Sequence, residues 1–139
     1  MILPNDATVL VSNGQKLRLF RNKGVEPAVR LTELPLPDIA AHNLGSGGRH
    51  RSSSANPDDQ RLAEDNFAAA VAEYVNGKVL EGEITALVIV ADPRTLGEIR
   101  LHLHPSVPPV MIGQLPKDFT HHPVAELQTA LAGASHLRN

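Results

Sequence analysis

The longest run of β-branched and aliphatic residues spans residues 84–91 and reads Ile-Thr-Ala-Leu-Val-Ile-Val-Ala. A run without alternating polar positions is typical of a strand covered on both faces. Asp92, which suits a helix N-cap, and Pro93, which suits the first helical position, come next. An apolar stripe follows at helical spacing, through Leu96, Ile99 and Leu103. The pattern predicts a central strand that leads directly into a helix ending before Pro105.

The first third of the chain shows the pattern of a β-meander. Residues 7–12 and 16–21 are strand-like and flank the dipeptide Asn13-Gly14, which suits the positive φ angles of a tight hairpin turn. A third strand is expected between Val29 and Leu36. Prolines at the end of this segment stop the strand or place it at the edge of the sheet.

Two further helices and one short strand are expected in the rest of the chain. The longest helix begins at Asn56-Pro57 and ends at Asn76-Gly77, because the first pair suits a helix start and the second a left-handed stop. A short strand is predicted at residues 110–112. Thr120 is the expected cap of a last helix, whose apolar stripe is Val124, Leu127 and Leu131.

The expected order of elements is therefore β-β-β-α-β-α-β-α. A three-stranded antiparallel meander followed by right-handed crossovers gives a mixed five-stranded sheet with flanking helices. This connectivity predicts an α/β fold of the ribonuclease H-like type. A length of 139 residues suits a single domain covering residues 1–139.

Residues 38–55 break the pattern, and we expect them to form a flexible Gly/Ser-rich loop. The loop contains Gly47 and Gly48, followed by a short basic stretch of Arg49, His50 and Arg51. The glycines lack the Gly-Lys-Ser/Thr ending of a phosphate loop, so a nucleoside triphosphate site is not predicted.

The composition narrows the possible functions. The formal net charge is −2 and the sequence pI is about 6.4, which does not favour broad electrostatic binding to nucleic acid. Aromatic residues make up 3% of the chain, which argues against base stacking as a main binding mode. The chain has no cysteine and no run of about 18 apolar residues, so we expect a cytoplasmic protein without a membrane span.

The end of the predicted central strand carries three candidate binding residues, Asp92, Arg94 and Thr95. In open α/β sheets, functional groups gather where strands end and helices begin. A cation in the first turn of a helix is unfavourable there, so Arg94 is expected to contact either an anion or a carboxylate such as Glu98. Gly97 in the same helix predicts close packing or the close approach of a partner.

The sequence does not support a catalytic or metal site. Two-metal nuclease chemistry needs several converging carboxylates, and although Glu64 or Asp65 is placed to approach Asp92, the first strand supplies none at its functional end. The histidine spacings of one and two residues do not match helical ligand pairs. The serines at 52–54 lack a strand-to-helix elbow. We therefore predict no catalytic residue, no metal ligand and no cofactor.

Several motifs resemble those of the bacterial host-attachment protein family, whose members are described as required for attachment to host cells. The motifs are Ile2-Leu3-Pro4, Val9-Leu10-Val11-Ser12-Asn13-Gly14, Ala91-Asp92-Pro93-Arg94-Thr95-Leu96-Gly97-Glu98 and Lys117-Asp118-Phe119-Thr120-His121-His122-Pro123. The resemblance covers nearly the whole chain. It departs at Asn13, where the family often has aspartate, and in the loop from Gly48 to Ser54.

That family is in turn similar to the middle domain of archaeal and eukaryotic peptide-chain release factors, where a Gly-Gly-Gln loop promotes peptidyl-tRNA hydrolysis. Here Arg49 follows Gly47-Gly48 in place of the glutamine. The resemblance implies a non-enzymatic adaptor that contacts RNA, tRNA or the ribosome. The alternatives are a cytoplasmic protein-interaction module that affects host attachment indirectly, and a hydrolase acting on RNA or peptidyl-tRNA.

Overall fold

The computed structural model describes residues 3–37 and 57–133 of the chain. Five strands form one mixed sheet in the order β3-β2-β1-β4-β5. The strands are β1 (Thr8–Ser12), β2 (Leu17–Asn22), β3 (Leu31–Leu34), β4 (Leu87–Ala91) and β5 (Met111–Leu115). The meander β1-β2-β3 is antiparallel, whereas β1, β4 and β5 are parallel. The predicted α/β class and mixed five-stranded sheet are confirmed, and the order is compatible with ribonuclease H-like connectivity.

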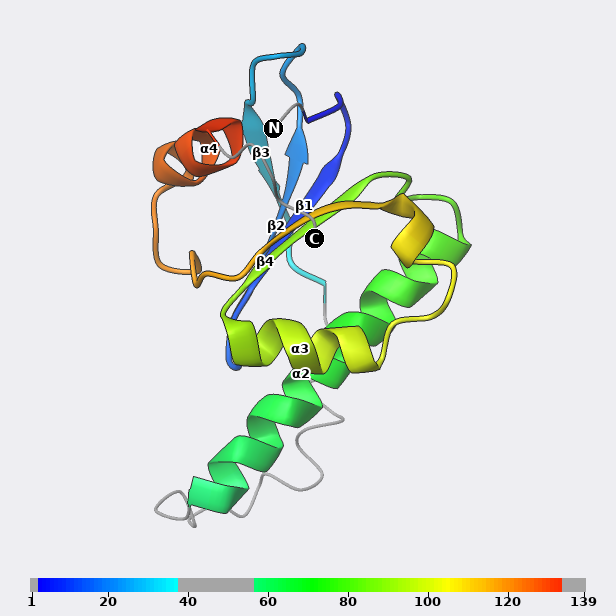
Figure 1. Cartoon of the computed structure of the whole chain (residues 1–139), viewed down its shortest axis with the longest axis vertical. Helices are drawn as coiled ribbons and strands as arrows, with labels where there is room; N and C mark the ends of the chain where they lie inside the picture. Colours follow the sequence, from blue (N-terminus) through cyan, green and yellow to red (C-terminus); the bar gives the residue numbers. More distant parts are fainter. Residues whose placement is uncertain (1–2, 38–56, 134–139) are drawn as a thin grey trace.

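The sheet lies between two helical layers (Figure 1). One face carries α2 (Pro57–Leu80) and α3 (Pro93–Leu101), and the other carries α4 (Val124–Gly133). A short 3-10 helix, η2 (Pro108–Val110), precedes β5. In the described part of the chain, none of the helices has the length and apolar character needed to cross a membrane.

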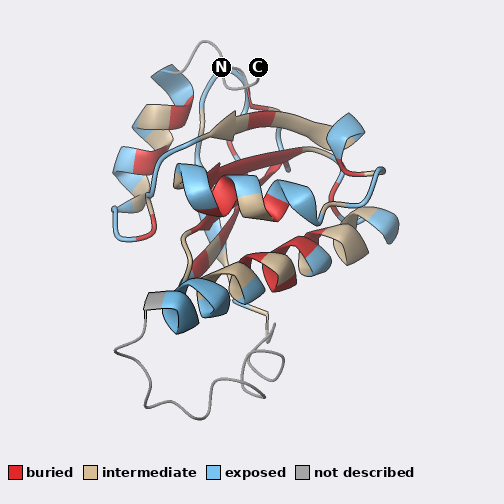
Figure 2. Ribbon diagram, turned by 60° about the horizontal axis from the view of Figure 1, so that its bottom comes forward, coloured by how far each residue is buried: buried red, intermediate tan, exposed pale blue. Residues whose placement is uncertain are grey.

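Strand β4 is buried along its whole length, which explains its uninterrupted apolar sequence. Leu87 and Ile89 pack toward α2 and α3, while Val88 and Val90 pack toward α4. Figure 2 shows buried residues along the strands and on the inner sides of the helices. Each of these side chains contributes roughly 1.5–3 kcal/mol through burial. The strand is interior, as predicted, but it begins at Leu87 and not at residue 84, and β1 occupies the middle of the sheet.

Several predicted boundaries were wrong. The long helix does not stop at Asn76-Gly77 but continues to Leu80, and the glycine with a positive φ of 81° is Gly82. The helix after β4 ends at Leu101, before the predicted position. The last strand was predicted at 110–112 but spans Met111–Leu115. The double proline that precedes it forms η2.

Candidate functional site

Polar side chains from three loops and two helices meet at the carboxyl edge of the sheet. Ser12 of β1 lies opposite Ala91 of β4, and Val90 lies opposite Leu115 of β5, so the three parallel strands end at about the same level. We call the polar residues at this edge the carboxyl-edge cluster: Asn13, Glu64, Asp65, Asp92, Arg94, Thr95, Asp118 and Thr120. Open α/β sheets commonly bind ligands at this position.

Asp92 caps α3, as predicted. Its Oδ2 accepts a hydrogen bond of 3.1 Å from the backbone N–H of Thr95, and Pro93 occupies the first turn. The other carboxylate oxygen, Oδ1, is buried and has no hydrogen-bond partner among the described residues. Thr95 is buried beneath the cap with 6% of its surface exposed. Asp92 therefore acts as part of the helix start, with one oxygen sealed from solvent.

Arg94 contacts carboxylates from α2. Its Nη2 lies 2.6 Å from Asp65 Oδ1 and its Nη1 lies 3.2 Å from Glu64 Oε1. The prediction that Arg94 contacts Glu98 was wrong. Oε2 of Glu98 instead lies 3.7 Å from Nε2 of His102, the C-cap residue of α3. Arg94 does contact a carboxylate, as one of the two alternatives predicted. Its partners lie about 30 positions away in the sequence. The pairing joins the first turn of α3 to α2.

Gly14 brings the β1–β2 loop into contact with the same part of α2. A Cβ added at Gly14 would lie 2.7 Å from Glu64 Cγ and 2.9 Å from Glu64 Cβ, which is too close for any other residue without movement. The predicted hairpin between the first two strands is confirmed, but the positive φ angles expected at Asn13 and Gly14 were wrong, because neither residue has one. Glycine is needed here for close approach.

Asn13 uses its side chain to organise the loop. Its Oδ1 accepts hydrogen bonds of 2.7 Å from the backbone N–H groups of both Gln15 and Lys16. Its Nδ2 donates to Thr120 Oγ1 at 3.0 Å and to Asp118 Oδ2 at 3.2 Å. One amide thus fixes the β1–β2 loop and ties it to the segment between β5 and α4.

Asp118 and Thr120 form the other half of this link. Both the backbone N–H and the hydroxyl of Thr120 donate to Asp118 Oδ1, at 2.8 and 2.6 Å. Partial burial alone would raise the pKa of Asp118, but the hydrogen bonds from Thr120 and Asn13 outweigh it and leave the pKa below its ordinary value. Thr120 was predicted to cap the last helix, and this was wrong, because α4 begins at Val124.

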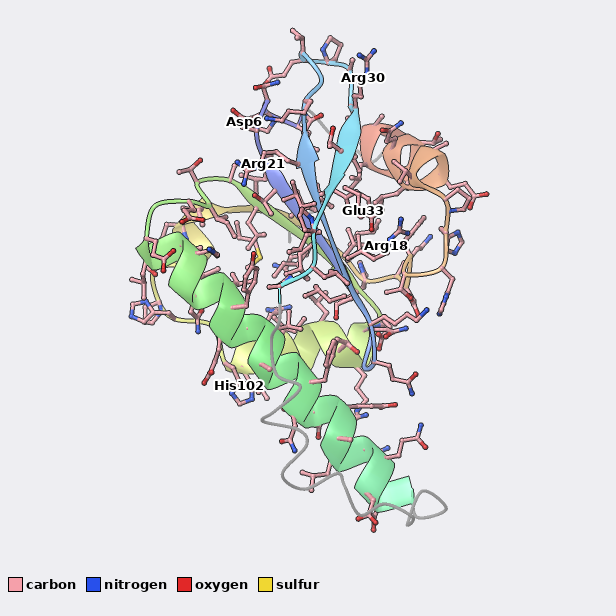
Figure 3. All side chains as sticks on the ribbon, turned by 180° about the vertical axis from the view of Figure 1, so that it is seen from behind. Asp6, Arg18, Arg21, Arg30, Glu33 and His102 are labelled. Carbon is pink, nitrogen blue, oxygen red and sulfur yellow. The ribbon has the colours of Figure 1, made fainter. Side chains whose placement is uncertain are left out.

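Arg18 of β2 holds the segment between β5 and α4 from the other side. Its Nη1 donates to the backbone oxygen of His122 at 2.8 Å, while Nε and Nη2 each donate to Glu33 at 3.0 Å. Figure 3 shows Arg18 and Glu33 pointing toward one another from adjacent strands. These hydrogen bonds hold the pKa of Glu33 below its ordinary value. The segment before α4 is therefore attached both to the β1–β2 loop and to β2.

Two of the described histidines, His104 and His122, pair with residues close to them in the sequence. His122 Nδ1 lies 2.7 Å from Glu126 Oε1, and His104 Nδ1 lies 2.9 Å from Ser106 Oγ. Within residues 3–37 and 57–133, no group of three His, Cys, Asp or Glu side chains has an arrangement that could hold a metal ion. Glu64 and Asp65, which sequence reasoning placed near Asp92 for metal chemistry, are instead bound to Arg94.

The structure brings together only part of the predicted binding set. Asp92, Arg94 and Thr95 lie at the carboxyl edge, whereas Gly47, Gly48, Arg49, His50 and Arg51 lie outside the described residues. Sequence reasoning missed the roles of Asn13, Gly14, Asp118 and Thr120. The one available signal was their position in the motifs that carry the family resemblance.

Residues 6–131 match the family model described as bacterial archaeo-eukaryotic release factor family 12. The match spans most of the 139 residues, so the chain belongs to this family. The predicted relation to release factors is thereby confirmed, while the host-attachment name stays a prediction. No curated protein matches the sequence.

Proposed function

We propose that this release factor family member is a non-enzymatic adaptor that contacts RNA or the ribosome. Family membership over residues 6–131 is the observation that carries the proposal, because release factors act in translation. The proposed contacts are Arg49, His50 and Arg51 after the Gly47-Gly48 pair, together with the carboxyl edge. An effect on host attachment through a protein partner is the alternative.

The bonding of the carboxyl-edge cluster supports an adaptor over an enzyme, and the one carboxylate oxygen of Asp92 without a partner among the described residues is buried from solvent. Asp92 accepts from the helix that it caps, Arg94 is paired with two carboxylates, and Asp118 is held by Thr120 and Asn13. Groups engaged in this way position loops. Catalysis would require a free base or nucleophile directed at a substrate.

Arg94 is exposed enough to bind an RNA phosphate. Its side chain is 39% exposed, so a phosphate oxygen can compete with the partly exposed Glu64 and Asp65 for the guanidinium. Such competition makes the Arg94 contribution weak and strongly salt-dependent. The main affinity is therefore assigned to Arg49 and Arg51, which follow glycines in the sequence and carry the local positive charge.

Sucrose-gradient sedimentation of cell lysate tests this assignment. We expect the protein to migrate with ribosomal subunits at low salt and to dissociate as salt rises. The double substitution Arg49→Ala and Arg51→Ala should lower the affinity and reduce the salt slope by about 2, one for each phosphate contact. The matched control, Arg30→Ala with Arg61→Ala, removes two exposed charges and should leave co-migration unchanged.

Two outcomes contradict the proposal. One is migration with smaller proteins only, which would support the protein-interaction alternative. The other is unchanged co-migration in the Arg49→Ala, Arg51→Ala variant, which would place the contact elsewhere on the surface.

An activity assay separates the adaptor from a hydrolase. We expect purified protein to leave peptidyl-tRNA and structured RNA intact with either Mg²⁺ or Mn²⁺. Asp92→Ala should lower the free energy of unfolding by about 1 kcal/mol, because the N-cap bond to Thr95 is lost. Metal-dependent cleavage that Asp92→Asn abolishes at an unchanged melting temperature would overturn the non-enzymatic proposal.

A further inference from the structure

Two exposed lysines, Lys16 and Lys117, lie on segments that meet at the carboxyl edge of the sheet. Lys16 belongs to the β1–β2 loop, where its backbone N–H donates to Asn13 Oδ1 at 2.7 Å and its carbonyl accepts from the N–H of Asn13 at 3.0 Å. Lys117 precedes Asp118, whose Oδ2 accepts from Asn13 Nδ2 at 3.2 Å. One asparagine therefore holds the two lysine-bearing segments together.

His121 adds a third ionisable side chain to this surface, and it is exposed. Partial burial raises the pKa of Asp118, but hydrogen bonds from Thr120 and Asn13, together with the charge of His121, outweigh that effect and lower the pKa. The electrostatic effect shows that His121 lies close to Asp118. We call Lys16, Lys117 and His121 the loop cations.

The carboxylates near the loop cations already have partners of their own: Asp118, Glu33 and Glu126. Within residues 3–37 and 57–133, neither lysine of the loop cations has an ion pair or a side-chain hydrogen bond. Elsewhere a surface lysine does find a carboxylate, because Lys23 Nζ lies 2.9 Å from Asp6 Oδ1. The loop cations therefore leave positive charge that the described fold does not neutralise.

The surface around the loop cations lacks an exposed apolar anchor. The large hydrophobic side chains that are exposed in the described chain lie in other segments: Val25, Leu36, Leu62, Leu80 and Leu101. Specific protein interfaces are centred on aromatic or aliphatic anchors, so this surface does not suit a protein partner. Phe119, the one Phe, Tyr or Trp in residues 116–122, packs against the core beside α4, which leaves no such ring for stacking on a base.

The outer side of α3 carries no comparable indication of a partner's chemistry. A Cβ added at Gly97 would meet no heavy atom of the described residues within 4 Å, beyond its chain neighbours and the adjacent helix backbone. The close packing predicted at Gly97 was therefore wrong. The approach of a partner there stays a prediction, because nothing in the described chain shows what would cover this face.

We infer that the loop cations bind the phosphate backbone of single-stranded RNA. Lysine meets a phosphate as a point charge and does not read the base, so binding here is independent of the RNA sequence. Because Asn13 holds the two segments together, neighbouring phosphates of one strand reach both lysines. The inference rests on the RNA contact proposed above and assigns a second part of that contact to the described fold.

Contact with two phosphates is weak and depends on salt. Each phosphate that a protein neutralises on a single strand contributes about 0.7 to the slope of log affinity against log salt concentration. The formal net charge of the chain is −2, which opposes wider electrostatic binding. The loop cations therefore add to the contact assigned to Arg49 and Arg51 and do not replace it.

Fluorescence anisotropy of labelled oligouridine, titrated with the full chain at several salt concentrations, tests the inference. Lys16→Ala with Lys117→Ala should weaken binding and reduce the salt slope by about 1.4, for two phosphate contacts. The matched control is Lys23→Ala with Arg30→Ala, which removes two exposed charges beside the β2–β3 loop, at the opposite end of the sheet (Figure 3). It should leave the affinity and the slope unchanged. Both variants should melt near the wild-type temperature, because all four side chains are exposed.

The outcomes separate this inference from the proposed function. A salt slope that is unchanged in the Lys16→Ala, Lys117→Ala variant, while Arg49→Ala with Arg51→Ala loses affinity, overturns the inference and leaves the proposed function in place. A wild-type chain that does not bind oligouridine also overturns it, and if that chain fails to migrate with ribosomal subunits, the proposed function falls as well. Equal binding of polyglutamate of matched length would assign the loop cations to an acidic protein and overturn the inference.

Discussion

The two ends of the sheet are held together in different ways. At the amino end of β1, one fully buried side chain, Asn22, makes four hydrogen bonds to backbone groups. At the carboxyl end, partly exposed side chains bond to one another across Asn13, Arg94 and Asp118. The Asn22 side chain is fully buried, so water does not reach its amide atoms, whereas exposed side-chain pairs can exchange a partner for a ligand. The amino end of the sheet is therefore held rigidly, whereas the side chains at the carboxyl end can change partners.

Asn22→Ala should have the largest effect on stability. Its Nδ2 donates to the carbonyls of Leu3 and Pro4, and its Oδ1 accepts from the N–H groups of Gly24 and Arg30. Removing it leaves buried polar groups unpaired, so we expect a loss of about 3 kcal/mol or more in urea unfolding. Asn76→Ala is the control.

Asn76 also bonds two backbone groups, those of His102 and His104, but in an exposed setting. Water can replace those bonds, so the loss should be about 1 kcal/mol. Equal losses at Asn22 and Asn76 would contradict the contrast between the two ends.

Gly14→Ala should have the next largest effect. The new methyl group would lie 2.7 Å from Glu64 Cγ, so α2 or the β1–β2 loop must move and the contact with Arg94 is disturbed. We expect a loss of about 1–3 kcal/mol, as for other overpacked positions, measured by thermal unfolding. In a Glu64→Ala background the Cγ contact is gone but the Cβ contact at 2.9 Å remains, so the same substitution should cost less without becoming neutral. An unchanged cost there would show that the Glu64 Cγ is not the source of the strain.

Asp118→Asn should have the smallest effect and a distinct pH dependence. The pKa of Asp118 is lowered in the folded state, so its hydrogen bonds add stability above the ordinary value of 3.8, and this is lost as the pH falls through the lower folded value. We expect a loss below about 1 kcal/mol at neutral pH, because the site is exposed.

The difference between wild type and Asp118→Asn should shrink as the pH falls below about 4, where the wild-type carboxylate takes up a proton in the unfolded chain before it does so in the folded chain. Glu73→Gln, an exposed substitution on α2, serves as the control in the same titration. A stability difference that persists at low pH would assign the effect of Asp118→Asn to shape and not to charge.

The pattern of hydrophobic and capping residues was sufficient to predict the strands and helix starts that depend on residues close together in the sequence. The apolar run of β4 and the Asp92-Pro93 start of α3 follow from residue types within a few positions, and both are confirmed. The Asn22 bonds reach as far as 19 residues, and the Asn13 link to Asp118 spans 105 residues. Neither follows from periodicity, because such pairs form only after the sheet brings distant loops together.

The same limit applies to Arg94 and to the end of α2. Helix-end electrostatics predicted that Arg94 would need a negative partner, but not that the partner would come from another helix. Asn76-Gly77 reads as a stop signal, yet packing of Val75 and Val79 against the core extends the helix past it. Tertiary contacts outweighed the local preference in both cases.

Side-chain contacts hold helix α2 at Glu64 and Asp65, so a tilt about that point would move its first turn. Its first turns extend beyond the sheet in Figure 1, and the Arg94 pairs and the Gly14 contact lie at Glu64 and Asp65, part of the way along its 24 residues. At 1.5 Å per residue, Pro57 is roughly 10 Å from this fulcrum. A tilt of about 10° around it would therefore move the start of α2 by roughly 2 Å. Small rearrangements among three side chains at the carboxyl edge would therefore be amplified into a larger displacement of the first turn of α2.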